Sequence, residues 1–470
     1  MIITQICFSF GLKKELIQLP NDYNVPIRFV EIDNFGPLKH VRLNLASPLQ
    51  LFIGPQASGK STLGKAIYFC RRIRDYLCEF ARDIWNSPKR SELYGDFLKS
   101  LKNPFMGCFG TTKHMKPFTI RYVYSRDTEK SVTITLGSDN YVKFAFSSSL
   151  RIPLIALLES AQKVSINLSG DFFQDTMAQQ TYLAQFKQEA SKLFEDDASL
   201  LYIPAGRNLL ATIPDRILDS NASAKNILDQ ADITEIDLCT QSFIRYIKRM
   251  RGRFGSRLEE IKTNYVKTVS SAIQYRDVDL ACELIHKILK ADYVYDKDGE
   301  KLYYDEGRWT KLMFGSSGQQ EVLWALNCLF LAILQREKTF FVFEEPESHI
   351  FPDSQLTIME LVALLINSTG SEVFLTTHSP YILTATNLLI YSGQIERSNN
   401  QSIVNPRFRL HANLVDAYLI QSSAHELQHL IPEGQSLINA VEIDRISEVI
   451  NQKMDQIMDI EVSSGGAGQL

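Results

Sequence analysis

The sequence lacks the features of a membrane protein, a secreted disulfide-rich protein or a strongly basic nucleic-acid binder. Its 470 residues carry a net charge of −4 and its pI is near 6.1, so bulk charge gives no electrostatic footprint for nucleic acid. The longest apolar run, LWALNCLFLAIL at 323–334, is too short to cross a bilayer. The first residues also lack the basic and apolar segments of a signal peptide. We therefore expect a cytoplasmic protein with no membrane association.

Cysteine is present, but not in a pattern that predicts a metal site or a disulfide framework. The seven cysteines are odd in number and scattered, and none forms a C-x-x-C pair. A reducing compartment is the simplest expectation for Cys7, Cys70, Cys78, Cys108, Cys239, Cys282 and Cys328.

The order of hydrophobic patterns predicts an α/β protein of two or three lobes. Alternating apolar residues predict strands, and apolar residues spaced three or four apart predict helices. A chain that is 45% hydrophobic and 22% charged can bury a sizeable core. The expected elements are strand–turn–strand–strand at 27–53, a helix from 60 to about 85, three antiparallel strands at 117–147, mostly helices at 150–290, a hairpin at 291–307 and helices at 410–462.

A glycine-rich loop at 54–62, GPQASGKST, fits the pattern G-x-x-x-x-G-K-[ST] between a predicted strand and a predicted helix. Its backbone N–H groups and the helix N-terminus would surround phosphate oxygens. Lys60 would reach the β- and γ-phosphates, and Ser61 would ligate Mg²⁺. The alternative is a glycine turn that caps a helix. The candidate nucleotide-binding residues are Gly54, Pro55, Gln56, Ala57, Ser58, Gly59, Lys60, Ser61 and Thr62.

Two adjacent carboxylates end an apolar run in TFFVFEEPESHIFPDSQ at 339–355. Such a run is typical of a strand buried in a parallel sheet, whose carboxyl end faces the ligand site. Glu344 would hold magnesium through water, and Glu345 would orient and activate the attacking water. The alternative, an exposed acidic turn, is less favourable because paired carboxylates at a buried strand end are costly without a cation.

A second anion site is predicted in FGSSGQQEVLWALNCLF, just before a long apolar helix. We interpret Ser317 and Gln320 as its capping box. Ser316, Gly318 and Gln319, with the free N–H groups of the helix, would bind the γ-phosphate of a partner chain, because the glycine loop of the same chain is unlikely to reach them.

A polar group also ends the apolar run of SEVFLTTHSPYIL at 371–383. This group is His378, which we include among the catalytic candidates with Lys60 and Glu345. A lone histidine is more often a core or capping residue, and only its position after the carboxylate strand favours a catalytic role.

The order of these motifs resembles the ABC-class ATPases of the RecF, SMC and overcoming-lysogenisation-defect (OLD) group. FEEPESHIFP in particular is similar to their E-E-P-E-x-H-x-x-P pattern. The resemblance implies a head-to-head dimer in which each ATP is held by Lys60 of one head and Ser316 of the other. It also allows such dimers to form part of a larger oligomer. It makes His378 the switch residue at the γ-phosphate. YIPAGRNLL at 202–210 is also similar to a stretch common in the group, but a strand-to-helix turn explains it equally well.

The expected fold is therefore a P-loop ABC-type head with an antiparallel β subdomain, an inserted helical lobe and a C-terminal helical segment. The corresponding boundaries are 1–150 for the N-terminal half of the head, 151–290 for the inserted lobe, 291–400 for the C-terminal half of the head and 401–470 for the C-terminal segment.

Departures from the group narrow the functional hypothesis. No long heptad run indicates SMC-type arms, and no D-x-D pair follows His378 as in the Toprim nuclease domain of OLD proteins. The chain resembles instead the stand-alone ATPases of antiphage systems. The preferred relative is PtuA of Septu, which acts with an HNH nuclease, and the second is AriA of PARIS, which acts with a Toprim nuclease. We expect a slow, regulatory ATPase that acts as a nucleotide-gated sensor and scaffold for a separate nuclease. The alternative is a RecF-like repair ATPase that clamps DNA directly, and a transporter subunit is disfavoured.

Two surfaces are candidates for partners. RYIKRMRGRFGSR at 245–257 carries six basic residues, which suit either nucleic acid and acidic partners or a merely solvated helix face. The acidic amphipathic segment at 440–461 would pack on its own head or dock an effector. The sequence leaves both choices open.

Overall fold

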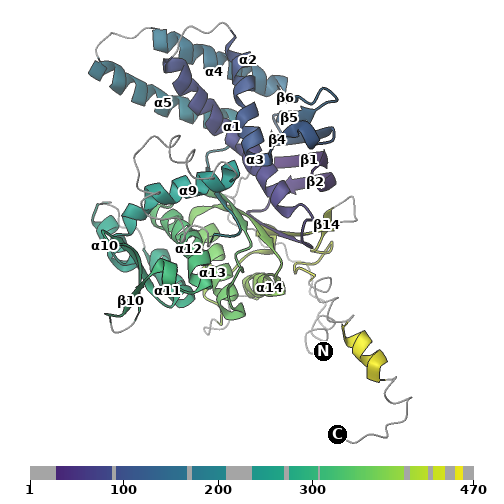
Figure 1. The fold of residues 1–470 in the computed structure, drawn as a ribbon, viewed down its shortest axis with the longest axis vertical. Coiled ribbons are helices and arrows are strands. Elements are labelled where there is room, and N and C mark those ends of the chain that lie inside the picture. Colours follow the sequence, from purple (N-terminus) through teal and green to yellow (C-terminus); the bar gives the residue numbers. More distant parts are fainter. Residues whose placement is uncertain are drawn as a thin grey trace, which may run out of the picture.

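The computed structural model describes residues 28–86, 92–166, 172–207, 236–268, 275–304, 307–395, 403–421, 427–439 and 450–458. These residues form two lobes (Figure 1). The upper lobe contains a five-stranded antiparallel sheet and long helices, and the lower lobe contains a six-stranded sheet covered by helices.

The six-stranded sheet positions the candidate site. Its strand order is β14-β13-β3-β12-β11-β7, and every pairing from β13 to β7 is parallel. The strands β3, β11 and β12 are buried along their whole length, which explains their continuous apolar sequences. Parallel pairing brings the carboxyl ends of five strands to one edge. The bounds are β3 Leu49–Ile53, β7 Ser199–Ile203, β11 Thr339–Glu344, β12 Glu372–Thr377, β13 Val415–Ile420 and, antiparallel at the border, β14 Leu427–His429.

The two antiparallel sheets confirm the predicted hairpins. The five-stranded sheet has the order β2-β1-β4-β5-β6, and buried residues alternate with exposed ones along most of its strands. Its bounds are β1 Arg28–Phe35, β2 Leu38–Leu45, β4 Phe118–Ser125, β5 Lys130–Leu136 and β6 Val142–Phe146. The three-stranded sheet contains β8 Asp292–Asp296, β9 Gly299–Tyr303 and β10 Trp309–Lys311.

The helix predicted from residue 60 is confirmed as α1, Lys60–Asn86, which passes from the glycine loop into the upper lobe (Figure 1). The remaining α-helices are α2 Leu93–Ser100, α3 Lys102–Phe109, α4 Ser148–Ile166, α5 Phe172–Phe194, α9 Leu238–Met250, α10 Leu258–Thr268, α11 Arg276–Leu289, α12 Ser317–Gln335, α13 Pro352–Thr369 and α14 Pro380–Gln394. Short 3₁₀ turns lie at Thr112–His114, Arg251–Phe254, Leu312–Phe314, Pro406–Phe408 and Ala412–Leu414.

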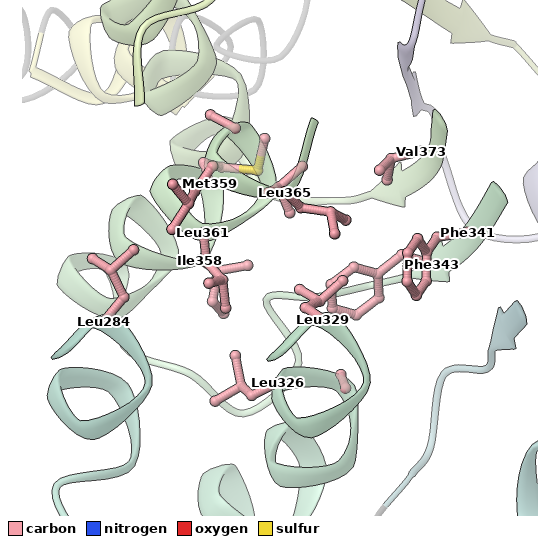
Figure 2. Packing of buried hydrophobic residues seen from close by; sticks show 14 of the residues in the cluster. Leu284, Leu326, Leu329, Phe341, Phe343, Ile358, Met359, Leu361, Leu365 and Val373 are labelled. Carbon is pink, nitrogen blue, oxygen red and sulfur yellow. The ribbon is translucent and has the colours of Figure 1, made fainter. Parts of the chain in front are cut away.

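The lower core packs α11, α12 and α13 against the central sheet (Figure 2). Leu326 and Leu329 of α12 face Ile358 of α13, and Phe341 and Phe343 of β11 lie beside them. The apolar run at 323–334 is thus a buried helix, as expected. No helix among the described residues has the length and apolar character needed to span a membrane.

Two stretches expected to be helical contain strands of the central sheet. The C-terminal segment forms β13 and β14 where helices were predicted, and only residues 450–458 of its described part are α-helical. The interval 151–290 includes β7, which pairs with β11. The three strands are short, so their sequences alone do not separate strand from helix, and pairing with the sheet decides. Residues 440–449 and 459–461 of the acidic segment lie outside the described residues, and the boundaries of the proposed lobes remain predictions.

A buried ionic cluster joins the two sheets at the amino ends of β12 and β7. Arg71 of α1 donates to Asp196 at 2.7 and 2.8 Å and to Glu372 at 2.7 Å. Arg28 of β1 donates to Glu372 at 2.8 and 3.0 Å, and Arg74 donates to the Asp196 carbonyl at 2.6 Å. Burial alone would raise the pKa of Glu372, but Arg71 and Arg28 outweigh burial and lower it from 4.5 to about 2. The cluster therefore depends on both carboxylates being ionised.

We expect Glu372→Gln to lower the free energy of unfolding at pH 7 by about 3–5 kcal/mol, because it leaves buried guanidinium groups without their counter-charge. The exposed Arg42–Glu31 pair offers a control, since Glu31→Gln should cost at most about 1 kcal/mol. Urea denaturation measures both. Equal losses in the two variants would contradict a structural role for the cluster.

The wild-type protein should also show acid sensitivity that the Glu372→Gln variant has in part lost. Because the folded-state pKa of Glu372 lies below its ordinary value of 4.5, its contribution is complete above about pH 4.5 and disappears as the pH falls toward 2. Denaturation curves between pH 5 and 3 should show this slope in the wild type and a shallower slope in the variant.

Candidate functional site

Four parallel strands deliver the predicted site residues to one edge of the central sheet. The glycine loop follows β3, His378 follows β12, Glu344 ends β11 with Glu345 directly after it, and residues 204–207 follow β7. The pairing of β12 with β3 and with β11 places the histidine between the loop and the two glutamates.

The glycine loop is shaped by close backbone approaches. A Cβ atom added at Gly54 would lie 2.2 Å from the carbonyl oxygen of Ile420, at the end of β13. Gly59 has φ +105°, and an added Cβ would lie 2.5 Å from Leu38 of β2. Ala57 also has a positive φ, of 61°. Side chains at the two glycines would therefore distort the loop that the sequence predicts to hold phosphates.

The polar groups of the loop fit a phosphate ligand. Lys60 is buried, and its Nζ donates to the carbonyl oxygens of Gly54 at 2.8 Å and Pro55 at 3.0 Å. Burial lowers the pKa of Lys60, and three nearby glutamates offset part of that effect. The Oγ of Ser58 is buried and has no hydrogen-bond partner among the described residues. Ser61 and Gln56 are exposed. An oxyanion would satisfy the Ser58 hydroxyl and the lysine ammonium together.

The two glutamates that end β11 have different surroundings. Glu344 is buried, and its carboxylate accepts from the Tyr202 hydroxyl at 2.6 Å and from the Ala205 amide at 3.1 Å. Glu345 is half-buried, and its Oε1 lies 3.3 Å from Nε2 of His378. Glu345 also adopts φ +42°, in the left-handed region that is unfavourable for a residue with a side chain. The structure thus joins the predicted water-activating residue to the predicted switch histidine.

A third carboxylate, Glu347, orients the segment that carries the histidine. Its Oε1 accepts from the His378 amide at 2.6 Å and from the Thr377 hydroxyl at 2.8 Å. Its Oε2 is buried without a partner among the described residues. Burial raises the pKa of Glu347. The sequence placed this residue in the E-E-P-E pattern but assigned it no role.

The predicted second anion site lies at the start of α12, with its capping box one residue earlier than expected. Ser316, not Ser317, is the N-cap, and its Oγ accepts from the Gln319 amide at 3.2 Å. Gln319, not Gln320, closes the box by accepting from the Ser316 amide at 3.0 Å. The register is decided by where the helix begins, and both S-x-x-Q pairs fit the sequence equally well.

The start of α12 is packed against the residues that follow β11. A Cβ added at Gly318 would lie 2.6 Å from the carbonyl oxygen of His349. Gln319 also donates to the Leu289 carbonyl at 2.7 Å. Within the described ranges, no hydrogen bond joins Ser316 or Gln319 to the glycine loop of the same chain.

Sequence reasoning missed Arg207 as a central residue of the site. The side chain is completely buried and donates to the carbonyl oxygens of Glu344 at 2.7 Å and Glu345 at 3.1 Å. It also donates to the carbonyl of Glu321 on α12 at 2.8 Å. Burial lowers the pKa of Arg207, and the Glu321 carboxylate offsets part of that effect. The available signal was YIPAGRNLL, of which residues 208–210 lie outside the described residues.

The basic cluster at 245–257 lies on α9, on the 3₁₀ turn that follows it and on residues 255–257. Arg251 is buried, with its guanidinium 4.8 Å from the ring centre of Tyr295, so it does not belong to the surface. Lys248 is half-buried. The exposed members are Arg245, Arg249, Arg253 and Arg257, each four residues after the last.

Comparison with known proteins assigns the chain to a family. A family model described as an AAA ATPase domain matches residues 26–383, which is more than half of the chain. No curated protein sequence matches it. Among solved structures, an SMC head bound to the C-winged helix domain of ScpA is 12% identical, with 87% of this chain and 98% of that chain covered and a TM-score of 0.39.

Two further SMC heads are also 12% identical to the chain. For the head domain from Thermotoga maritima, 77% of this chain and 92% of that chain are covered, with a TM-score of 0.33. For the Pyrococcus furiosus head domain with an extended coiled coil, bound to the C-terminal domain of ScpA, the corresponding values are 90%, 99% and 0.36. The family match confirms the predicted α/β P-loop ATPase fold class and shows that this chain belongs to the AAA ATPase domain family.

Proposed function

We propose that this ATPase hydrolyses ATP at sites shared between two heads of a homodimer and uses its nucleotide state to control a separate effector nuclease in antiphage defence. The observation that supports the shared site is the bonding of Ser316. Among the described residues its hydrogen bonds are made with residues at the start of α12 and none joins the glycine loop, whereas Glu345 and His378 lie 3.3 Å apart at the sheet edge that also carries that loop.

In the proposed mechanism the glycine loop and Lys60 bind the phosphates of ATP. Ser61 and Glu344 would hold Mg²⁺, which neutralises charge on the phosphate oxygens. Glu345 accepts a proton from the attacking water, and His378, 3.3 Å away, donates a hydrogen bond toward the γ-phosphate. Glu347 holds the backbone from which that histidine projects.

Exposed apolar side chains beside Ser316 support self-association through this face. Met313 and Phe314 precede the serine and are 54% and 72% exposed, and Phe351, which follows the glutamate turn, is 76% exposed. Tyr381, after the histidine, is 54% exposed. Apolar residues gathered around a polar site are typical of an interaction surface.

The nuclease partner is proposed from the resemblance of FEEPESHIFP to the RecF, SMC and OLD group and from the absence of a D-x-D pair after His378, which together make the chain resemble the stand-alone ATPases of antiphage systems. PtuA of Septu, with an HNH nuclease, is the preferred relative, and AriA of PARIS, with a Toprim nuclease, is the second. In this role hydrolysis is slow and regulatory, and the ATP-bound dimer presents or withholds a surface for the nuclease. Copurification of the native protein with the products of neighbouring genes tests the assignment, and recovery without any nuclease would contradict it.

Glu345→Gln should bind ATP with unchanged affinity but hydrolyse it at least about 100-fold more slowly, because the proton acceptor is lost while the phosphate contacts remain. The variant should therefore accumulate as a dimer in the presence of ATP. Lys60→Ala serves as the control that fails to bind nucleotide at all. Fluorescent-nucleotide titration, phosphate release and size-exclusion chromatography measure these properties. Normal turnover in Glu345→Gln would rule out the assigned role of the carboxylate.

The shared site predicts complementation between two inactive chains. A Lys60→Ala chain lacks a working phosphate loop, and a Ser316→Arg chain lacks a working signature, so a mixed dimer regains one intact site. An equimolar mixture should recover roughly a quarter of the wild-type rate, because half of the dimers are mixed and each has one of two sites. Mixtures that stay as inactive as either chain alone would argue against a composite site.

A RecF-like DNA clamp is the second candidate function, and the exposed arginines on α9 and just after it favour it. Every exposed residue between 236 and 258 is arginine or glycine, and no acidic residue occurs between Asp237 and Glu259. Arg257 pairs with Asp292 at 3.3 Å, whereas Arg245, Arg249 and Arg253 form no ion pair within the described residues. Guanidinium groups bind phosphate well, and the absence of exposed large apolar side chains in 236–268 favours a duplex backbone over stacked single-stranded bases.

The same helix is attached to the helix of the phosphate loop. Asp237, the N-cap of α9, lies 3.2 Å from Lys65 of α1, and Arg72 of α1 donates to Ser242 of α9 at 2.9 Å. DNA bound at these arginines would therefore contact α9, which is joined through α1 to the glycine loop.

Charge reversal tests the DNA clamp. The triple Arg→Glu variant at 245, 249 and 253 should weaken binding of a DNA duplex and remove DNA stimulation of ATP hydrolysis, while basal hydrolysis persists. Arg→Glu changes at the exposed residues Arg42, Arg121 and Arg151 alter net charge equally and serve as the control. Fluorescence anisotropy at several salt concentrations measures binding. Equal loss in both triple variants would mean that the arginine row has no special role.

A further inference from the structure

The buried guanidinium of Arg207 contacts the residues at the ends of β7 and β11 and the N-terminal part of α12. Its NH1 donates to the carbonyl oxygens of Pro204 and Glu344, at 2.8 and 2.7 Å, which lie at the ends of β7 and β11. Its NH2 donates to the carbonyl of Glu345 at 3.1 Å. Its Nε donates to the carbonyl of Glu321, one turn into α12. The fork of planar donors thus fixes two strand ends and one helix relative to one another.

The partner that holds Arg207 in place is Glu321. Both side chains are at most 1% exposed, and their closest charged atoms are 3.5 Å apart. The Glu321 carboxylate also accepts from the backbone amide of Arg207 at 2.8 Å. Because the arginine and the glutamate are bonded through both backbone and side chain, the position of the guanidinium is set by α12.

The residue positioned by this arrangement is the strained Glu345. Its φ of +42° is unfavourable for an L-residue by roughly 1–2 kcal/mol, so the surrounding bonds must maintain it. Its amide donates to the Thr376 carbonyl at 2.9 Å, and its carbonyl accepts from Arg207. These two bonds hold the peptide on either side of the Cα atom and so direct the carboxylate toward His378.

We propose that Arg207, held by Glu321, is the positioning residue that keeps Glu345 of the same chain oriented for water activation. The inference rests on the proposed catalytic role of Glu345. The side chain of Arg207 is completely buried and donates to protein carbonyl oxygens, so its role is positioning and not contact with the reacting atoms. Its loss should therefore slow the chemical step without weakening ATP binding.

Arg207→Lys tests this role, because lysine keeps the positive charge but cannot reproduce the fork of bonds. We expect kcat to fall about 100-fold, with unchanged KM and unchanged affinity for a fluorescent ATP analogue. Glu321→Gln keeps the shape of the side chain that holds Arg207 and should lower kcat about 10-fold. This variant tests the same role if Arg207→Lys does not fold. Glu300→Gln is the matched control, because Glu300 accepts from Trp324 of α12 at 3.1 Å and is not bonded to Arg207.

Mixed dimers separate positioning of Glu345 from a general structural role. In a dimer of Lys60→Ala and Ser316→Arg chains, the surviving site uses Glu345 of the Ser316→Arg chain. Arg207→Lys should lower the activity about 100-fold when added to that chain and have little effect in the Lys60→Ala chain. Equal loss from both placements, or a higher KM with unchanged kcat, would overturn the proposal. Inactive mixed dimers without any change at Arg207 would instead contradict the shared site itself, and the homodimer kcat and KM values then decide the role of Arg207.

Discussion

Parallel pairing of the central strands is the constraint on which the rest of the site depends. Because β3, β12, β11 and β7 run in the same direction, the residues that follow them share one edge although they come from distant parts of the chain. The strand order also determines which site residues are neighbours. His378 lies between the phosphate loop and the glutamates because β12 lies between β3 and β11.

The two edges of this sheet are secured by different buried charges. At the amino edge, Arg28 and Arg71 neutralise Glu372 and Asp196 and so join the antiparallel sheet and α1 to the central sheet. At the carboxyl edge, Arg207 is bonded mainly to backbone carbonyl oxygens and to one carboxylate. The first arrangement links lobes through ion pairs. The second fixes the path of the backbone beside the nucleotide site, where small displacements alter the chemistry.

The exposed arginines on and after α9 are connected to the predicted nucleotide site through the contacts of α9 with β7 and α1. The helix α9 packs on β7 and is bonded to α1 through Asp237 and Ser242. A ligand on its arginines and a nucleotide in the glycine loop would therefore act on shared elements. Arginine side chains suit an acidic protein surface as well as DNA, so these residues are compatible with both candidate functions.

The sequence by itself determined the phosphate loop, the carboxylates after β11, the histidine after β12 and the long helix from Lys60. Each is a local pattern in which a strand, a turn and a functional residue are consecutive, so neighbouring residues suffice to identify it. The acidic strand end and the switch histidine were each predicted from an apolar run that ends in a polar group, and the parallel sheet places Glu345 and His378 3.3 Å apart.

Only the tertiary structure decided the register of the α12 cap, the strands β7 and β13, and the role of Arg207. Two overlapping S-x-x-Q pairs are equivalent until packing sets where the helix begins. Short strands carry too few residues for a period, and they form because an existing sheet offers them a partner. The bonds of Arg207 join residues more than one hundred positions away in the chain, a relationship that no local pattern contains and that only the folded backbone creates.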